Sequence, residues 1–430
     1  MGHPQISPPP ILLAWTMWGL GASLYLVGFF QRVVPSVITG ELMTDFGIGA
    51  AGLGNLSAFY FYSYVAMQIP TGILADHWAP RRVMTFGAVG AGLGSMLFAL
   101  APNLALACAG RFLIGGSVAV AFVSMMKISS LWMVPRHFAL ASGLAMLIGI
   151  LGGVFGGMPL GLSVGIWGWR PVLLVSSGIP FLIAGAIWLI VRDDPQEYGY
   201  ISYGAPGVQS SGVGALTGLR QIVGYRNTWL LFLIPGGMVG SSLAFAGLWG
   251  VPFLTNQYHL SPATAAAVSS ALLIAWALAS PIFGSLSDRI GRRKPLYVLG
   301  AILTLCSWGA IVYVPGLTLP ALVFLLILAG FGAGSVNIGF AFAKESVPAH
   351  LSGNSGGFCN MGGMLGPMVL QPAIGWQLDR LLRIKKKLYP GATGYDFHIW
   401  QGAFSLMIAW LILSLALICF TRETFCRQQL

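Results

Sequence analysis

Charged residues are scarce in this sequence. Only 8% of its 430 residues are Asp, Glu, Lys or Arg, whereas 56% are hydrophobic and the mean hydropathy is +0.81. A soluble globular domain carries roughly 25% charged residues, so this chain cannot cover a water-facing surface. The composition therefore predicts an integral membrane protein whose main solvent is the lipid bilayer.

The patterns of metal and catalytic sites are also missing. The five cysteines form no CxxC pair, and none of the six histidines has a partner at metal-binding spacing. No Walker loop is present, and the glycine-rich segment at residues 152–157 lies in an apolar run without a preceding strand. We therefore expect no enzyme activity, no catalytic residues, no metal, no cofactor and no direct use of ATP.

The net charge of +11 is explained by the positive-inside rule for membrane proteins, not by nucleic-acid binding. If the N-terminus is cytoplasmic, most loop lysines and arginines fall on the cytoplasmic side. The basic cluster at residues 380–387 falls on the other side and argues against this orientation. We expect both termini in the cytoplasm and the chain in the inner (plasma) membrane of a bacterium.

Twelve apolar segments are long enough to cross a bilayer, which takes about 20 helical residues. They begin near Ile11, Ala50, Val83, Leu104, Ala139, Pro171, Trp229, Ala265, Leu296, Leu319, Gly353 and Ile399. A Gly/Ser-rich tract divides them into two sets of six and has the composition of a flexible linker. The predicted parts are a cytoplasmic N-terminus (1–10), a six-helix bundle (11–192), a cytoplasmic linker (193–226), a second six-helix bundle (227–421) and a cytoplasmic tail (422–430).

A short polar loop occurs twice. Residues 72–82 (GILADHWAPRR) follow the second apolar segment, and residues 284–293 (GSLSDRIGRR) follow the eighth. Asp76 and Asp288 occupy equivalent places, 212 positions apart. This repeat indicates that the chain consists of two copies of one structural unit.

Arg32 is the main candidate for substrate binding, because it lies inside the first apolar segment. A charge in the hydrocarbon costs at least ~2.5–3.5 kcal/mol, so a charged residue inside a span is a candidate functional residue. Arg32 is expected either to bind an anion in a central cavity or to be structural, by snorkelling or pairing with Glu41. Lys127, near the cytoplasmic end of the fourth segment, is a candidate for substrate contact or an inner gate, and Arg111 for packing or gating. None of the eleven acidic residues lies at mid-span, so the cavity should prefer anions.

Other polar side chains complete the candidate site. Tyr60, Tyr64 and Gln68 recur at every fourth position and share one helix face. Three further candidates for substrate contact, each of which could instead form a helix–helix hydrogen bond, are Trp249, Asn337 and Asn360. Glu41, Asp45 and Glu345 lie near the ends of spans and are the candidates for proton coupling.

Twelve spans, duplicated halves and a repeated GxLaDrxGrr-type loop resemble the major facilitator superfamily. The resemblance implies an all-α membrane protein of two pseudo-symmetric six-helix bundles that rock about a central cavity. It also implies that Asp76, Arg82, Asp288 and Arg292 are gating residues. The first loop departs from the family pattern, since Ala79 stands where glycine is usual.

Within that superfamily, the first half is similar to the anion:cation symporter and organophosphate antiporter branches. The supporting residues are 29–32 (FFQR), Tyr64, 68–70 (QIP) and Lys127. In those branches the arginine of the first span contacts the anionic group of the substrate, a role that we carry over to Arg32. The second basic residue of the organophosphate pattern, in the seventh span, is absent, which disfavours a doubly charged phosphate.

These observations predict a secondary transporter for a small organic anion, such as a monocarboxylate metabolite. It would work as a monomer by alternating access, coupled to protons or by exchange. The alternatives are a transporter of a neutral or zwitterionic nutrient, such as an amino acid, nucleoside or sugar, and a non-transporting membrane sensor.

Overall fold

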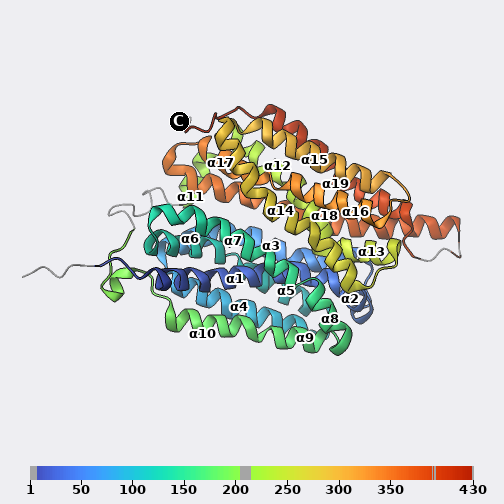
Figure 1. Cartoon of the computed structure of the whole chain (residues 1–430). Coiled ribbons are helices and arrows are strands. Elements are labelled where there is room, and N and C mark those ends of the chain that lie inside the picture. Colours follow the sequence, from blue (N-terminus) through green and yellow to red (C-terminus); the bar gives the residue numbers. More distant parts are fainter. Residues whose placement is uncertain (1–6, 204–214, 390, 392–393, 429–430) are drawn as a thin grey trace, which may run out of the picture.

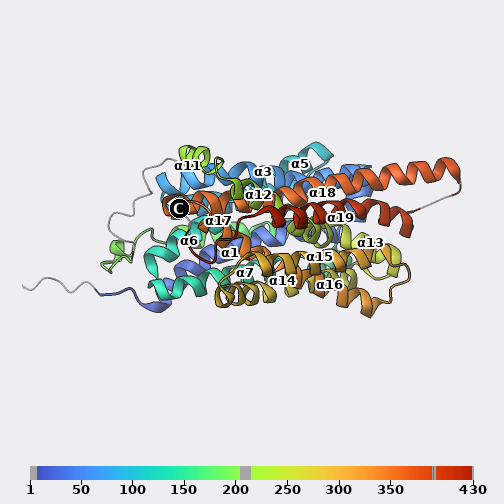
Figure 2. The same cartoon turned by 90° about the horizontal axis from the view of Figure 1, so that it is seen from above.

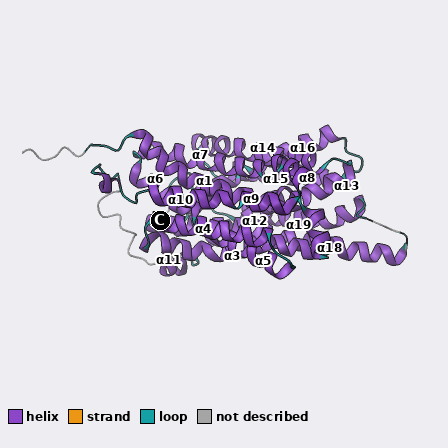
Figure 3. Ribbon diagram, turned by 90° about the horizontal axis from the view of Figure 1, so that it is seen from below, coloured by secondary structure: helices purple, strands orange, loops and turns teal. Residues whose placement is uncertain are grey.

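The computed structural model describes residues 7–203, 215–389, 391 and 394–428, and within its helices it leaves out the side chains of residues 73, 75–77, 135–136, 138–139 and 215–216. Long helices joined by short loops make up almost all of the described chain (Figure 3).

The first half contains ten helical pieces. They are α1 (Ile11–Val37), α2 (Thr39–Phe46), α3 (Ala50–His77), α4 (Pro80–Ala99), α5 (Leu104–Val118), α6 (Ala121–Trp132), α7 (Pro135–Phe155), α8 (Met158–Trp167), α9 (Trp169–Ser176) and α10 (Gly178–Ile190). Breaks divide three of the spans, so that α5 continues into α6, α7 into α8 and α9 into α10.

The second half has a similar series. It comprises α12 (Arg226–Ala244), the π-helix η2 (Phe245–Trp249), α13 (Gly250–Tyr258), α14 (Pro262–Ile290), α15 (Lys294–Tyr313), α16 (Leu319–Ala333), α17 (Val336–Glu345), the 3-10 turn η3 (Ala349–Leu351), α18 (Ser352–Leu388) and α19 (Phe397–Phe420). The expected linker region holds the 3-10 turn η1 (Pro195–Tyr198) and α11 (Ala215–Ile222). Most of the Gly/Ser-rich tract expected to be a flexible linker, residues 204–214, lies outside the described residues, and α11 begins directly after it.

The predicted all-α membrane fold is confirmed. Among the described residues, ten helical segments are long and apolar enough to cross a membrane. Together with α3, of 28 residues, and α18, of 37, they give twelve spans, and each begins within four residues of its predicted start.

The two halves lie one above the other, with their helices running roughly along the same direction (Figure 1). The described tail and α11 lie at one end, together with the repeated loops. We call this the hinge end, defined by Trp78, Ala79 and residues 291–293. The opposite end, the far end, carries α2, α13 and the last turns of α18, which reach beyond the other helices (Figure 2).

The two repeated loops end their helices differently. Gly291 caps α14 at φ +71°, a left-handed conformation that favours glycine. The equivalent Ala79 has φ −60° and leads into Pro80, the first residue of α4, where proline fits the first turn. The unusual alanine of the first copy therefore causes no backbone strain, because that loop does not use the left-handed turn.

The basic cluster at residues 380–387 forms the C-terminal turns of α18. Lys385, Lys386 and Lys387 occupy its last turn, where cations interact favourably with the helix dipole. Lys385 also forms an ion pair of 2.6 Å with Asp396. The cluster thus has a local structural role that its sequence did not reveal.

Candidate functional site

A small cavity of about 50 Å³ lies between the two halves, at the middle of the helices. The first half lines it with Tyr25, Phe29, Arg32, Tyr64, Met146 and Ile150. The second half lines it with Pro235, Val239, Leu243, Trp276, Val336, Asn337, Phe340, Asn360, Gly363 and Met364.

Arg32 enters this cavity from α1 and is only 3% exposed. Its Nε donates a hydrogen bond of 3.0 Å to the hydroxyl of Tyr60, which in turn donates to the carbonyl of Gly28 at 3.1 Å. The guanidinium carbon lies 4.3 Å from the ring centroid of Phe29 and 4.8 Å from that of Tyr64. Three aromatic rings therefore hold the cation, and no described group forms a hydrogen bond with its two Nη atoms.

No described carboxylate forms an ion pair with Arg32. The ion pairs found in the described chain lie near the ends of the helices, with Asp45, Glu197, Asp288, Glu345 and Asp396 as their acidic members. A buried charge without a counterion is costly, so an anion that reached Arg32 would be bound favourably.

Arg111 is a second buried cation behind the cavity, on α5. Its guanidinium donates to the carbonyls of Gln31, at 2.6 Å, and Ser57, at 3.3 Å, and lies 5.1 Å from the ring centroid of Tyr60. These bonds tie α5 to α1 and α3. They agree with the packing role considered from the sequence, and they leave Arg32 as the cation that faces the cavity.

The cavity brings together several of the predicted site residues. Tyr64, Asn337 and Asn360 line it with Arg32, and Tyr60 positions the arginine from behind. Gln68, one turn beyond Tyr64, accepts a hydrogen bond of 3.2 Å from the Asn360 amide. This bond links α3 to α18 across the seam between the halves.

Besides Tyr60 and Gln68, which contact lining residues from behind, two predicted site residues do not line the cavity. Lys127 is half-buried on α6. Trp249 is 2% exposed in η2, and its indole N–H donates to the carbonyl of Gln371 at 3.0 Å, while its ring packs edge-on against Trp400. These contacts fit the helix–helix alternative that the sequence left open for Trp249.

Sequence reasoning missed four aromatic residues of the cavity, Tyr25, Phe29, Trp276 and Phe340. Tyr25 and Phe29 precede Arg32 by seven and three positions and so lie on the same face of α1. This spacing could have identified them once Arg32 was chosen. Trp276 of α14 had no comparable signal, and its indole N–H has no described hydrogen-bond partner.

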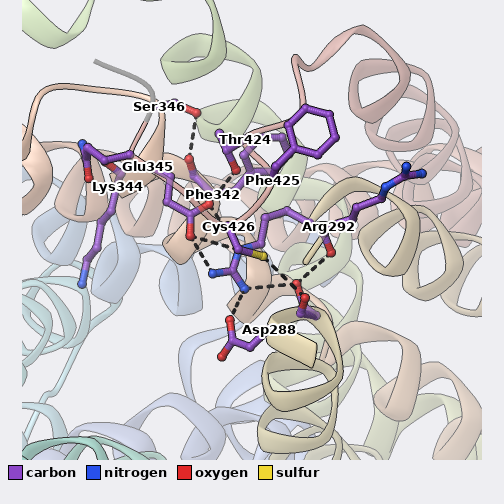
Figure 4. A network of polar contacts seen from close by, with 12 residues as sticks. Asp288, Arg292, Phe342, Lys344, Glu345, Ser346, Thr424, Phe425 and Cys426 are labelled. Atoms are coloured by element: carbon purple, nitrogen blue, oxygen red, sulfur yellow. Dashed lines mark hydrogen bonds and ion pairs between the residues drawn. The ribbon is translucent and has the colours of Figure 1, made fainter. Parts of the chain in front are cut away.

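A polar network at the hinge end includes Asp288, Glu345 and Thr424 (Figure 4). The side chain of Arg293 lies at its centre. The guanidinium forms ion pairs of 2.6 Å with Asp288 and 2.6 Å with Glu345, and it donates to the Ser287 hydroxyl at 3.1 Å. Burial acts to lower the pKa of Arg293, but the bonds to Glu345 and Asp288 dominate and raise it. The hydroxyl of Thr424, from the tail, donates to the other Glu345 oxygen at 2.5 Å.

The tail also caps the helix that follows this loop. The Glu423 carboxylate accepts hydrogen bonds of 2.9 Å from the backbone N–H groups of Arg293 and Lys294, at the start of α15. Arg292, which the family resemblance proposed as a gating residue, points its side chain away from the network (Figure 4). Arg293 is therefore the residue that joins Asp288 and Glu345, and the sequence motif did not distinguish it from its neighbour.

The first half repeats the same capping arrangement. Asp193, just after α10, accepts a hydrogen bond of 2.7 Å from the backbone N–H of Arg81, the counterpart of Arg293. The Arg81 side chain donates to the carbonyl of Trp188. Arg82 is exposed, and the side chain of Asp76 lies outside the described residues.

The remaining candidates for proton coupling lie away from the cavity. Glu41 is exposed on α2. Asp45 accepts a hydrogen bond of 3.0 Å from the indole of Trp169 and lies 3.3 Å from Arg170, all within the first half at the far end. Glu345 is held by Arg293 at the hinge end.

The fold and its site can be compared with those of known proteins. The family model described as Major Facilitator Superfamily matches residues 20–370 and 237–428. Among relatives, the chain is 24% identical to the "Probable sulfoacetate transporter SauU" of Cupriavidus necator, with 84% of this chain and 86% of the relative covered. It is also 24% identical to the "Probable galactarate/D-glucarate transporter GarP" of Escherichia coli (83% and 86% covered) and 22% identical to a "D-galactonate transporter" of Escherichia coli (82% and 86% covered).

Solved structures agree on the architecture. A bacterial homologue of the human lysosomal transporter Spinster, in an inward-facing and unoccupied conformation, superposes with a TM-score of 0.77 at 16% identity and covers 95% of this chain and 97% of that one. The nucleoside transporter NupG gives a TM-score of 0.72 at 14% identity, with 95% and 100% covered. At these identities the likeness shows the fold alone.

Proposed function

This chain belongs to the Major Facilitator Superfamily, and we propose that it is a secondary transporter that moves a small organic anion across the membrane by alternating access. One observation supports the proposal that the substrate is an anion. Arg32 lies at the cavity between the halves, and no described group forms a hydrogen bond with its Nη atoms or supplies a carboxylate partner. A carboxylate or sulfonate can accept two parallel hydrogen bonds from these atoms.

The substrate proposal is a monocarboxylate-type metabolite with further polar groups. Arg111 is bonded to backbone carbonyls, so a single cation is available to the substrate in the described cavity. Tyr64, Asn337, Asn360 and the indole N–H of Trp276 offer neutral hydrogen-bonding groups for the rest of the molecule. The relatives named for D-galactonate, sulfoacetate and galactarate or D-glucarate support small, polar organic acids.

The remaining parts of the proposal rest on the sequence. We place the protein in the inner membrane of a bacterium as a monomer, with the hinge end and both termini in the cytoplasm, because most loop lysines and arginines lie at that end. Transport is driven by proton symport or by exchange. Among the proton-coupling candidates we favour Glu345, because Arg293 and Thr424 both donate hydrogen bonds to its carboxylate.

Uptake into proteoliposomes tests the anion site. The panel contains monocarboxylates, sulfonates, dicarboxylates and neutral sugars or nucleosides, and the variants are Arg32→Ala, Arg32→Lys and the control Arg170→Ala. Loss of one partner of a buried charged pair costs 2–5 kcal/mol, so Arg32→Ala should weaken uptake of the anion at least ~30-fold. Arg32→Lys keeps the charge but not the planar fork, and should restore only part of it.

The control arginine lies at the far end beside Asp45, so its removal should leave the preference for anions unchanged. If neutral compounds were taken up equally well by the wild type and Arg32→Ala, the neutral-nutrient alternative would replace the anion proposal. Folded protein that transports nothing on the panel but binds its members would favour the sensor alternative.

A further inference from the structure

A carboxylate of the second half caps a helix of the first half at the far end. The two oxygens of Asp379, on α18, accept hydrogen bonds from the backbone N–H groups of Ala50, at 3.1 Å, and Ala51, at 2.9 Å. These are the first two residues of α3, and their N–H groups have no partner within that helix. Asp379 therefore spans the seam between the halves.

The local sequence of α3 leaves room for this cap. The residue before α3 is Gly49, which has no side chain to cap its own helix. A Cβ atom built on Gly49 would lie 2.7 Å from a carboxylate oxygen of Asp379, so a larger residue would collide with it. The usual capping side chain is thus replaced by one from the other half, and its negative charge suits the positive end of the helix dipole.

Close helix packing brings the cap into position. A Cβ on Gly375 of α18 would come within 2.2 Å of the carbonyl oxygen of Ala50, and one on Gly54 of α3 within 2.5 Å of the carbonyl oxygen of Gln371. The backbones of α3 and α18 therefore touch along this stretch. The hydroxyl of Tyr395 completes the arrangement by donating to Asp379 at 3.2 Å.

We propose that Asp379 is the latch of the far-end gate, which holds the two halves together at this end and must release α3 each time the end opens. Its role in transport rests on the proposed function, because alternating access requires this end to open and close. The capping bonds stabilise the state in which the far end is closed, and they contribute nothing to the state in which it is open.

Cysteine labelling measures the opening of this end. Ser270 of α14 is 6% exposed, and its hydroxyl lies 3.0 Å from a Cβ built on Gly157 of the other half. In a background without native cysteines, Ser270→Cys is alkylated by a membrane-impermeant maleimide only when the far end opens. Loss of an N-cap costs about 0.5–2 kcal/mol, so Asp379→Ala should raise the labelling rate by about 2- to 30-fold.

Asp396→Ala is the matched control, because Asp396 caps α19 at the same end but within its own half, by accepting from the Ile399 N–H at 3.0 Å. It should leave the labelling rate unchanged. Equal labelling in Asp379→Ala and its parent, or an equal rise in the control, would overturn the latch. Asp379→Leu, which has a similar size but no acceptor oxygen, gives the same comparison if the alanine variant does not fold.

Hydrogen exchange of the peptide that contains Ala50 and Ala51 gives a second measurement on the native cysteine background. Exchange should be faster in Asp379→Ala than in the wild type, with peptides of α19 unchanged. Unchanged exchange at the start of α3 would contradict the cap. Neither measurement uses a substrate, so the latch can fail while the anion proposal stands, and the reverse.

Discussion

Tyr60→Phe tests whether the orientation of Arg32, and not only its charge, matters for binding. The Tyr60 hydroxyl accepts from Arg32 Nε and donates to the carbonyl of Gly28. It holds the guanidinium so that both Nη atoms remain for a substrate. Phenylalanine keeps the ring, whose centroid is 5.7 Å from the guanidinium carbon, and removes only this anchor.

The expected loss follows from burial. Tyr60 is fully buried and Arg32 is 3% exposed, so water does not easily replace the lost hydroxyl. A hydrogen bond to a charged group is worth about 1.5–3 kcal/mol, which corresponds to about 10- to 150-fold in an equilibrium constant. We therefore expect the Kd for the anionic substrate to rise by about this factor, while the maximal transport rate at saturating substrate changes less.

Tyr64→Phe is the matched control. The Tyr64 ring stacks on Tyr60 with centroids 6.0 Å apart and lies 4.8 Å from the guanidinium, but its hydroxyl makes no described bond to Arg32. Binding is measured by calorimetry on purified protein and KM by uptake into proteoliposomes. A Tyr60→Phe variant that binds as tightly as the wild type would refute the positioning argument. Equal losses in both variants would instead point to direct contact of the hydroxyls with substrate.

Three further predictions concern the two ends. Gly375→Ala places a Cβ 2.2 Å from a backbone oxygen of α3, so it should disfavour the closed far end by about 5- to 150-fold and raise far-end labelling, whereas Gly178→Ala, with nothing within 4 Å, should not. Arg293→Ala breaks a buried ion-pair network and should destabilise the fold by about 3–5 kcal/mol, measured by thermal unfolding, with a much smaller effect from Arg292→Ala. Burial acts to raise the pKa of Glu423, but hydrogen bonds from four backbone N–H groups dominate and lower it. The stabilisation by this cap is therefore fully present above the ordinary pKa of 4.5 and is lost as the pH falls through the lowered pKa. The acid-induced drop in melting temperature should be smaller in Glu423→Gln than in the wild type.

The sequence predicted the spans well because each depends on a local property. About 20 apolar residues must form a helix in lipid, and proline, glycine or charge must end it. Arg32 could be chosen for the same reason, since a charge inside an apolar segment is visible without knowledge of its neighbours. Its cavity position agrees with that choice.

The contacts between distant segments could not be read in this way. Asp379 caps α3 from more than 300 positions away, and its own neighbourhood reads as a basic cluster. Trp249 and Asn360 looked alike as polar groups in apolar helices, yet only Asn360 lines the cavity. Helices that are apolar on every side give no periodic signal that tells the cavity face from the packed face.

The distribution of carboxylates would allow the proposed anion site to be combined with a gate at each end. Described carboxylates at the far end (Asp379) and the hinge end (Asp288, Glu345 and Glu423) form bonds that can be made and broken near water, where a charge is cheaper to uncover. A carboxylate beside Arg32 would instead pair permanently with the cation and remove its affinity for a substrate. A variant with Asn337→Asp should therefore fold and lose anion uptake, because the new charge would line the same cavity as Arg32. If uptake of the anion persisted in that variant, the positive potential of the cavity could not be the basis of selectivity.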